Sequence, residues 1–287
     1  MISTSFEYSR ATSLDDALAK LAATAGDGKF IAGGHSLVPL MKLRLSEPRI
    51  LIDIARIPGL SGIREKDDKI EIGAGTVHHD VASSALLQQR CPVLADCAAV
   101  IGDPQVRNRG TLGGSLAHAD PSADYPAVML ALDAEIHMKR ANGWRVVRAN
   151  DFFQGLFTVD LAPDEIIAAV TFTPVKAAGY AKLHQRASHF AIVGVAAALD
   201  VKDGVIQSAR IGLTGASSHA TRLEHVEKAL EGQPASAASI DAVARMAGAH
   251  LDDINSDIHA SADYRRAMVQ VFTERALKQA LARVGQA

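Results

Sequence analysis

Two short segments of the 287-residue chain each place a pair of adjacent glycines close to a hydroxyl side chain. They are 32–36, with the sequence AGGHS, and 111–115, with the sequence TLGGS. Glycine has no β-carbon, so the backbone can turn sharply, bring successive N–H groups together as an anion-binding nest, and let a phosphate come close. Two such loops could hold the two ends of a diphosphate. Each pair alone would equally suit an ordinary tight turn.

Neither segment matches the better-known nucleotide motifs. A P-loop has Lys followed by Ser or Thr after its last glycine, whereas Gly34 is followed by His35 and Gly114 by Ser115. The Rossmann fingerprint places glycines at its first, third and sixth positions, which neither segment does. A nucleoside-triphosphate hydrolase and a nicotinamide Rossmann domain are therefore disfavoured.

Composition excludes several other classes of protein. Thirty Lys and Arg against 32 Asp and Glu leave a formal charge of -2, which offers no global attraction for nucleic acid or an anionic membrane. No apolar run approaches the ~20 residues that span a bilayer, and 1–10 lacks a signal-peptide pattern. Cys91 and Cys97 are too few to hold an iron–sulfur cluster and suit a reduced compartment. We expect a cytoplasmic protein with no membrane span.

Histidines and serines show no catalytic pattern of their own. The eleven histidines include His78 with His79, His118, His184 with His189, and His250 with His259, but no H-E-x-x-H motif or paired cysteines accompany them. No Gly-x-Ser-x-Gly elbow surrounds a serine. The sequence predicts no metal site and no catalytic acid, base or nucleophile.

Periodicity in the first half predicts the elements around the glycine segments. A helix is expected over 13–25, with Ser13 and Asp16 as a capping box and Gly26 after its end. Further expected elements are strands over 29–32, 50–54 and 70–72, a helix capped by Thr76 that carries Val81, Ala85 and Leu86, and a helix over 93–100.

The second half is predicted to be strand-rich and then helical. Asn142-Gly143 and Asp203-Gly204 are hairpin signals, and 166–172 reads as another strand. The turn-prone stretch 175–179 is the expected domain boundary. A terminal helix is expected to pack on the last sheet through an apolar stripe, with Arg265 on the opposite, polar face. The residues of that stripe are Tyr264, Met268, Val271, Phe272, Leu277, Leu281 and Val284.

Longer stretches around these features resemble one protein family across essentially the entire chain. These stretches are AGGHSLVPLMKLRL (32–45), DPQVRNRG (103–110), TLGGSLAHADPSADYPA (111–127), DEIIAAVTF (164–172), YAKLHQRASHFAIVGVAAAL (180–199) and ADYRRAM (262–268). Their combination resembles the FAD-binding medium subunits of molybdenum hydroxylases of the carbon monoxide dehydrogenase and xanthine dehydrogenase type.

The resemblance implies an α+β fold. A vanillyl-alcohol-oxidase-type FAD-binding domain would occupy 1–176, in two subdomains of about 1–55 and 56–176. A smaller C-terminal flavoprotein domain, with a three-stranded antiparallel sheet and helices, would occupy 177–287.

It also implies a set of FAD-binding residues. The first segment would surround the diphosphate and the second would approach the ribityl and phosphate portion from the other side. Asp124 would hydrogen-bond near the ribityl or ribose hydroxyls, Ile101 and Ile167 would line the flavin, and Lys182 would place positive charge near its pyrimidine end. The implied residues of the two segments are Ala32, Gly33, Gly34, His35, Ser36 and Leu37, then Thr111, Gly113, Gly114 and Ser115.

Each single residue outside the glycine segments has a plainer interpretation. Lys182 in a strand would ordinarily face solvent, Asp124 would suit a turn or a helix cap, and the two isoleucines would be core residues. Two positions depart from the family. Phe190 aligns with a Tyr that covers one face of the flavin in the carbon monoxide enzymes, and Phe cannot donate a hydrogen bond. Ser115 stands where many relatives have Asn.

The implied function is that of an oxidoreductase subunit. Electrons would pass from iron–sulfur clusters on a small partner subunit through FAD to an external acceptor, while a large partner subunit carries the molybdenum cofactor and oxidises the substrate. Two alternatives stay open at this point. One is a self-sufficient flavin oxidase or reductase of the same superfamily, and the other is a flavin-free binding or scaffold module.

Overall fold

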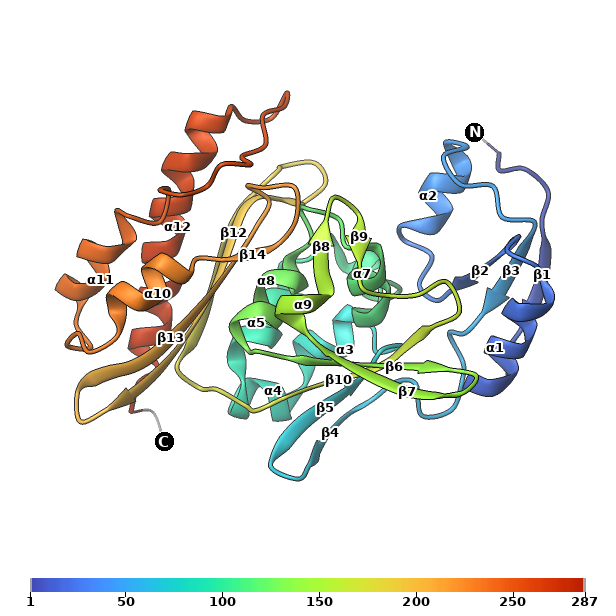
Figure 1. Ribbon diagram of the computed structural model, residues 1–287, viewed down its shortest axis with the longest axis horizontal. Helices are drawn as coiled ribbons and strands as arrows, with labels where there is room; N and C mark the ends of the chain where they lie inside the picture. Colours follow the sequence, from blue (N-terminus) through green and yellow to red (C-terminus); the bar gives the residue numbers. More distant parts are fainter. Residues whose placement is uncertain (1, 286–287) are drawn as a thin grey trace.

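The computed structural model describes residues 2–285 and shows three parts in a row (Figure 1). The N-terminal part is a parallel sheet of order β1-β3-β2, in which Glu7 and Gly28 both pair with Ile50. Its elements are β1 (Glu7–Arg10), α1 (Leu14–Ala23), β2 (Gly28–Ile31), α2 (Leu37–Lys42) and β3 (Ile50–Asp53). The expected elements are present, and β1 is an addition that its polar sequence, EYSR, did not predict.

Helix α1 begins as the sequence predicts. The Ser13 hydroxyl oxygen accepts the Asp16 N–H at 3.0 Å, and Gly26 follows the helix with φ +98°. The capping box is not completed, because the Asp16 carboxylate accepts from Thr12 rather than from the N–H of Ser13. The helix therefore has one of the two reciprocal bonds expected of it.

The middle part is an antiparallel sheet of order β4-β5-β10-β6-β7 with helices against it. The predicted hairpin joins β6 to β7, but its turn is Ala141 and Asn142, one residue earlier than predicted, because Gly143 already pairs with Arg140. The strands are β4 (Ile63–Lys66), β5 (Lys69–Gly73), β6 (Glu135–Arg140), β7 (Gly143–Arg148) and β10 (Ile166–Phe172), with a small separate pair β8 (Phe153–Gly155) and β9 (Thr158–Val159). The helices are α3 (His78–Ser83), α4 (Ala85–Arg90), α5 (Pro92–Ala99), α6 (Pro104–Arg107), α7 (Leu112–His118), α8 (Asp124–Ala131) and α9 (Ala149–Phe152).

The single helix predicted after Thr76 is wrong in two respects. The chain forms two short helices, because Ser84 between them is extended (φ -67°, ψ 113°) and its hydroxyl caps α4 by accepting the Leu87 N–H. Thr76 caps neither helix. Its hydroxyl oxygen accepts the Gly62 N–H at 2.9 Å and so joins β5 to the loop before β4.

The C-terminal part is an antiparallel sheet of order β11-β12-β13-β14 covered by helices. Three strands are long, as predicted, and a fourth strand of two residues lies at the edge. Asp203 and Gly204 have φ +52° and +75° at the predicted hairpin turn. The elements are β11 (Ala178–His184), β12 (Ala191–Lys202), β13 (Val205–Thr214), β14 (Thr221–Arg222), α10 (Glu224–Leu230), α11 (Ala237–Ala244) and α12 (Ala262–Ala282).

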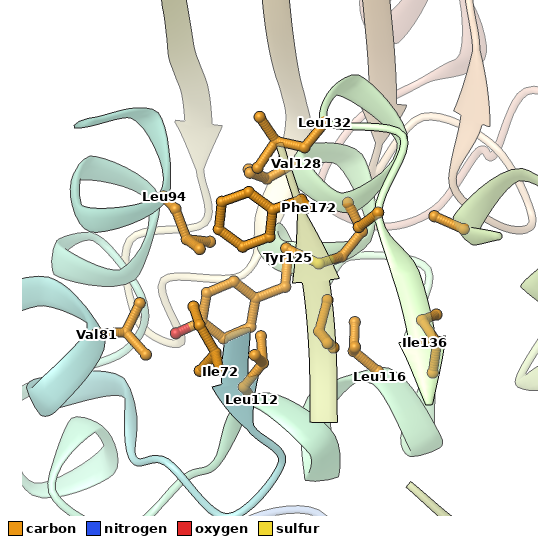
Figure 2. Close-up of a cluster of buried hydrophobic side chains, with 14 of the residues drawn as sticks. Ile72, Val81, Leu94, Leu112, Leu116, Tyr125, Val128, Leu132, Ile136 and Phe172 are labelled. Atoms are coloured by element: carbon orange, nitrogen blue, oxygen red, sulfur yellow. The ribbon is translucent and has the colours of Figure 1, made fainter. Parts of the chain in front are cut away.

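Helix α8 joins the middle and C-terminal parts. Every residue of α8 is buried, and its face meets β12 and β13 so closely that a Cβ on Gly212 would lie 2.1 Å from the Ala127 carbonyl oxygen. Figure 2 shows Tyr125 of α8 beside Phe172 of β10 at the centre of a buried cluster. Burial of this kind stabilises by about 25 cal/mol per Å² of apolar surface, so α8 anchors both parts.

Helix α12 packs on β11 and β12, as predicted, but through a different face. The buried side chains include Val269, Phe272 and Ala276, whereas Tyr264 is 47% exposed. Arg265, placed on the polar face by the sequence, is buried, and its guanidinium donates to the carbonyl oxygens of Ile192 and Gly215. The predicted apolar stripe is thus correct in part, but the buried face of α12 is rotated relative to it.

Candidate functional site

A cavity of about 410 Å³ lies where the three parts meet. The end of β2 and the start of α2 form one wall, and α7 with the 120–124 run forms another. The C-terminal part contributes residues 188–190. Of the predicted site residues, fourteen line this cavity, namely Ala32, Gly33, Gly34, His35, Ser36, Leu37, Ile101, Thr111, Gly113, Gly114, Ser115, Asp124, Ile167 and Phe190.

The first glycine segment connects β2 to α2 and meets the residues before the second segment. A Cβ on Gly33 would lie 2.1 Å from the Arg109 carbonyl oxygen, so only glycine permits this approach. Gly34 has φ +76°, a left-handed conformation that also favours glycine. The N–H groups of residues 33–36 donate to no acceptor among residues 2–285. Free N–H groups on a tight turn are suited to an anion, as the sequence predicted.

The second glycine segment differs from the predicted loop. It is the first turn of α7, with Thr111 as its N-cap. Its N–H groups are already used, since Leu112 donates to the Thr76 carbonyl and Gly113 to the Ala74 carbonyl. Gly114 donates to the Thr111 hydroxyl at 3.1 Å. A nest of free N–H groups is therefore wrong for this segment.

The second segment contributes residues without bulky side chains rather than free N–H groups. A Cβ on Gly113 would lie 2.5 Å from the Ala74 Cβ. Helix α7 can therefore lie directly against the end of β5, and the cavity keeps its width. The Ser115 hydroxyl lines the cavity and has no hydrogen-bond partner within residues 2–285.

His78 is a cavity residue that the sequence did not assign to a flavin site. It is 5% exposed, and its Nδ1 has no hydrogen-bond partner among residues 2–285. Burial, with the positive charges of His35 and Arg107 nearby, lowers its pKa from 6.5 to about 4. Its ring lies against Gly110, where an added Cβ would be 2.5 Å from Nε2. Gly110, which directly precedes TLGGS, was the sequence feature that could have pointed to a close neighbour such as His78.

Other described histidines do not gather into a metal site. Within residues 2–285, no group of three or more His, Cys, Asp or Glu side chains could hold a metal ion. His184 and His189 do lie together, with ring centroids 5.4 Å apart.

Ile101 and Ile167 reach the cavity from different elements. Ile101 lies in the turn after α5, and the Arg107 guanidinium fixes that turn by donating to the carbonyl oxygens of Ile101 at 2.9 Å and Gly102 at 3.1 Å. Ile167 comes from β10 and is 5% exposed. The DPQVRNRG stretch thus shapes the cavity through Arg107, a role that its sequence did not indicate.

Lys182 does not line the cavity, in contrast to the direct contact that the resemblance implied. Its ammonium is buried and lies 2.8 Å from Asp124 Oδ1, and it also donates to the Val100 carbonyl at 2.9 Å. Asp124, its partner, does line the cavity. The contact between Lys182 and the cavity is therefore indirect, through the Asp124 carboxylate.

Phe190 lies in the connection between β11 and β12 and is 46% exposed. Its carbonyl accepts the Gln185 N–H at 2.9 Å, and the next residue, Ala191, donates to the Ser122 carbonyl at 3.1 Å. These bonds hold an exposed aromatic ring at the wall of the cavity. Its stacking on a flavin stays a prediction.

The residues present fit FAD. Free N–H groups at residues 33–36 suit a diphosphate, and the Asp124 carboxylate and the Ser115 side chain at the cavity wall can supply polar contacts. The apolar side chains of Ile101, Ile167 and Phe190 suit a flat aromatic ring system.

Comparison with known families accounts for both halves of the chain. Residues 4–174 match the FAD binding domain in molybdopterin dehydrogenase, and residues 178–280 match the CO dehydrogenase flavoprotein C-terminal domain. The chain belongs to this family of FAD-binding medium chains.

Relatives of this flavoprotein subunit match along their whole length. The carbon monoxide dehydrogenase medium chain of Hydrogenophaga pseudoflava is 39% identical, with 99% of each chain covered. The 6-hydroxypseudooxynicotine dehydrogenase complex subunit alpha of Paenarthrobacter nicotinovorans is also 39% identical, with 97% of this chain and 95% of the relative covered.

Solved structures agree with this assignment. A carbon monoxide dehydrogenase from Hydrogenophaga pseudoflava superposes with a TM-score of 0.94 at 40% identity, covering 99% of both chains. Quinoline 2-oxidoreductase from Pseudomonas putida 86 gives 0.92 at 31% identity, covering 98% of this chain and 99% of the other. The predicted fold class and the prediction of an FAD-dependent oxidoreductase subunit are confirmed.

None of the described helices is both long and apolar enough to cross a membrane. The prediction of domains divided at residue 176 stays a prediction, as does the assignment of individual residues to FAD.

Proposed function

We propose that this chain holds FAD between the iron–sulfur clusters of a small partner subunit and an external electron acceptor. The acceptor is a quinone, NAD or another oxidant, and a large subunit with the molybdenum cofactor oxidises the substrate. The observation that carries the proposal is the cavity in which residues 33–36 offer free N–H groups opposite the first turn of α7. Bound FAD can accept one or two electrons and so link single-electron carriers to a two-electron acceptor.

The chain itself binds, orients and partly encloses the cofactor. The N–H groups of 33–36 hold the diphosphate through backbone dipoles, and Lys29 also lines the cavity. Ile101 and Ile167 form apolar contacts with the ring system, and Phe190 covers one face of it. No side chain of this subunit acts as a catalytic acid or base in the proposed function.

The two alternatives are less well supported. A self-sufficient oxidase would need a substrate pocket in the C-terminal part, but residues 188–190 of that part contribute to the FAD cavity itself. A flavin-free scaffold would have no need for the close approach of Gly33 to Arg109. A chain purified without flavin absorbance that also fails to take up FAD would favour the scaffold.

Substitution of Gly33 by Ala tests the proposed cofactor site. The new Cβ would meet the Arg109 carbonyl oxygen, so the first segment must move, and we expect FAD to bind more than about tenfold more weakly. Gly155→Ala is the matched control, because its nearest neighbour would be the Thr158 Cβ at 3.8 Å. Affinity is measured by quenching of flavin fluorescence. Equal affinity of the two variants would contradict the site.

Partnership is tested on the assembled complex. We expect the tagged chain to copurify with a small iron–sulfur subunit and a large molybdenum subunit when the three are expressed together. Relatives act in complexes named for carbon monoxide, nicotine, caffeine and xanthine, so we propose that the substrate is selected on the large subunit. The compound that bleaches the flavin of the complex identifies it. A chain that binds FAD but recovers no iron–sulfur partner would argue for the self-sufficient oxidase.

The reduced, buried thiols of Cys91 and Cys97 support a cytoplasmic location for this complex.

A further inference from the structure

A buried carboxylate at the wall of the FAD cavity is held entirely by the C-terminal part of the chain. Asp124 of α8 is 4% exposed and lines the cavity. Its carboxylate accepts from the Lys182 ammonium at 3.0 Å and from the Tyr180 hydroxyl, and both of these side chains come from β11. The sequence pointed to Asp124 and Lys182 but gave no indication of Tyr180.

The surroundings of Asp124 act on its pKa in opposite directions. Burial raises the pKa of the carboxyl above its ordinary value, and the Lys182 charge and the hydrogen bonds from Lys182 and Tyr180 reduce this rise. The other titratable groups that face Asp124 are Cys97 of α5 and its neighbour Tyr125, and burial raises the pKa of both, so both stay neutral. Lys182 supplies the compensating charge, and Tyr180 supplies the one neutral donor.

Residues of the neighbouring elements β12 and α12 help to place Tyr180 and its hydroxyl. Its pKa is raised well above 10 by burial and by the Asp124 charge, so it remains a donor. A Cβ on Gly194 of β12 would lie 2.6 Å from the hydroxyl oxygen, so glycine leaves the room it occupies. The Tyr180 N–H donates to Gln279 Oε1 of α12 at 3.1 Å. Gln279 of α12 therefore fixes the backbone of Tyr180, and Gly194 of β12 leaves space for its hydroxyl.

We propose that Tyr180 is a positioning residue of the FAD site, which with Lys182 keeps Asp124 ionised and holds its carboxylate at the cavity wall as a hydrogen-bond acceptor for the bound cofactor. This inference rests on the proposed function and adds to it a contribution of the C-terminal part. An ionised carboxylate accepts two or more hydrogen bonds, whereas a protonated one has lost part of that capacity. FAD affinity should therefore weaken as Asp124 takes up a proton.

Tyr180→Phe in the full chain removes only the hydroxyl. Without this donor Asp124 binds a proton more readily, so the weakening of FAD affinity at low pH should begin at a higher pH than in the unaltered chain. Hydrogen bonds to charged groups are strong enough that we expect a loss of about tenfold in affinity near the midpoint. FAD titrations by fluorescence quenching between pH 5 and 8 measure both. Tyr264→Phe, an exposed tyrosine of α12, is the control and should leave the profile unchanged.

A double-mutant cycle separates positioning from a merely structural role. If Tyr180 acts through Asp124, then Tyr180→Phe should change FAD affinity by less than about twofold in an Asp124→Asn background. An unshifted pH midpoint, or an equal loss at every pH that persists in that background, would overturn the inference while leaving FAD binding intact. An unaltered chain that binds no FAD would instead overturn the proposed function.

Discussion

At the scale of single residues, several polar groups of the residues around the cavity have no hydrogen-bond partner within the described chain. His78 is buried with a free Nδ1, and residues 33–36 keep their N–H groups unpaired within the described chain. Leaving a buried polar group such as His78 Nδ1 unpaired costs roughly 1–3 kcal/mol. Residues 33–36 are partly or fully exposed, so a ligand can reach their N–H groups, which is why these unpaired donors are informative about function.

His78 should make the stability of the flavin-free chain depend on pH. Its pKa is about 4 in the folded chain and 6.5 when exposed, so between these values the unfolded chain binds a proton that the folded chain does not. The contribution is fully favourable above pH 6.5 and is lost as the pH falls toward 4. A shift of this size corresponds to a loss on the order of 3 kcal/mol.

Urea unfolding at pH 7.5 and pH 4 measures this dependence. In His78→Gln, the stability lost between the two pH values should be smaller by that amount than in the unaltered chain. His79→Gln alters the exposed neighbour and should retain the full dependence. The assignment to His78 is wrong if the two variants lose the same stability.

At the scale of elements, the second glycine segment works as a helix start. Thr111 accepts the Gly114 N–H, so Thr111→Val leaves that donor without its partner in the helix cap. Such caps contribute about 1 kcal/mol, and we expect a loss of that size in the free energy of unfolding together with weaker FAD binding. Thr111→Ser keeps the acceptor and should behave like the unaltered chain. Equal stability of the Val and Ser variants would show that the cap is unimportant.

Local signals predicted these elements well, and long-range packing explains the failures. The hairpin turn at Asp203-Gly204 is specified by two residues whose backbone preferences need no distant partner, and the hairpin near Asn142-Gly143 forms with its turn one residue earlier. The face of α12 is different. Gly179 lets β11 approach until an added Cβ would lie 2.5 Å from the Ala276 carbonyl oxygen, so small residues such as Ala276 join Phe272 and Leu277 on the buried face, while Tyr264 turns away. Hydrophobic periodicity alone favours the larger side chains.

Some features of the candidate site could likewise be predicted from the local sequence, and others could not. The glycines could be identified from sequence because a residue without a Cβ is what allows another backbone segment to come close. Which N–H groups remain free depends on acceptors at Thr76 and Ala74, far from the segment that uses them. The Tyr180 hydroxyl reaches Asp124 only because α8 lies under β12 and β13. Such partners come from the arrangement of sheets, which no local pattern encodes.

At the scale of the whole molecule, FAD binding and folding of all three parts should be one event. The cavity takes residues from each part, and α8 is buried between the middle and C-terminal sheets. Because FAD binds the folded chain, FAD at 100 times its dissociation constant should add about 2.7 kcal/mol to the free energy of unfolding. In urea, release of flavin fluorescence and loss of far-ultraviolet circular dichroism should share one midpoint that rises with FAD concentration. Two separate transitions, with strand content lost while flavin stays bound, would mean that the C-terminal part is not needed to hold the cofactor.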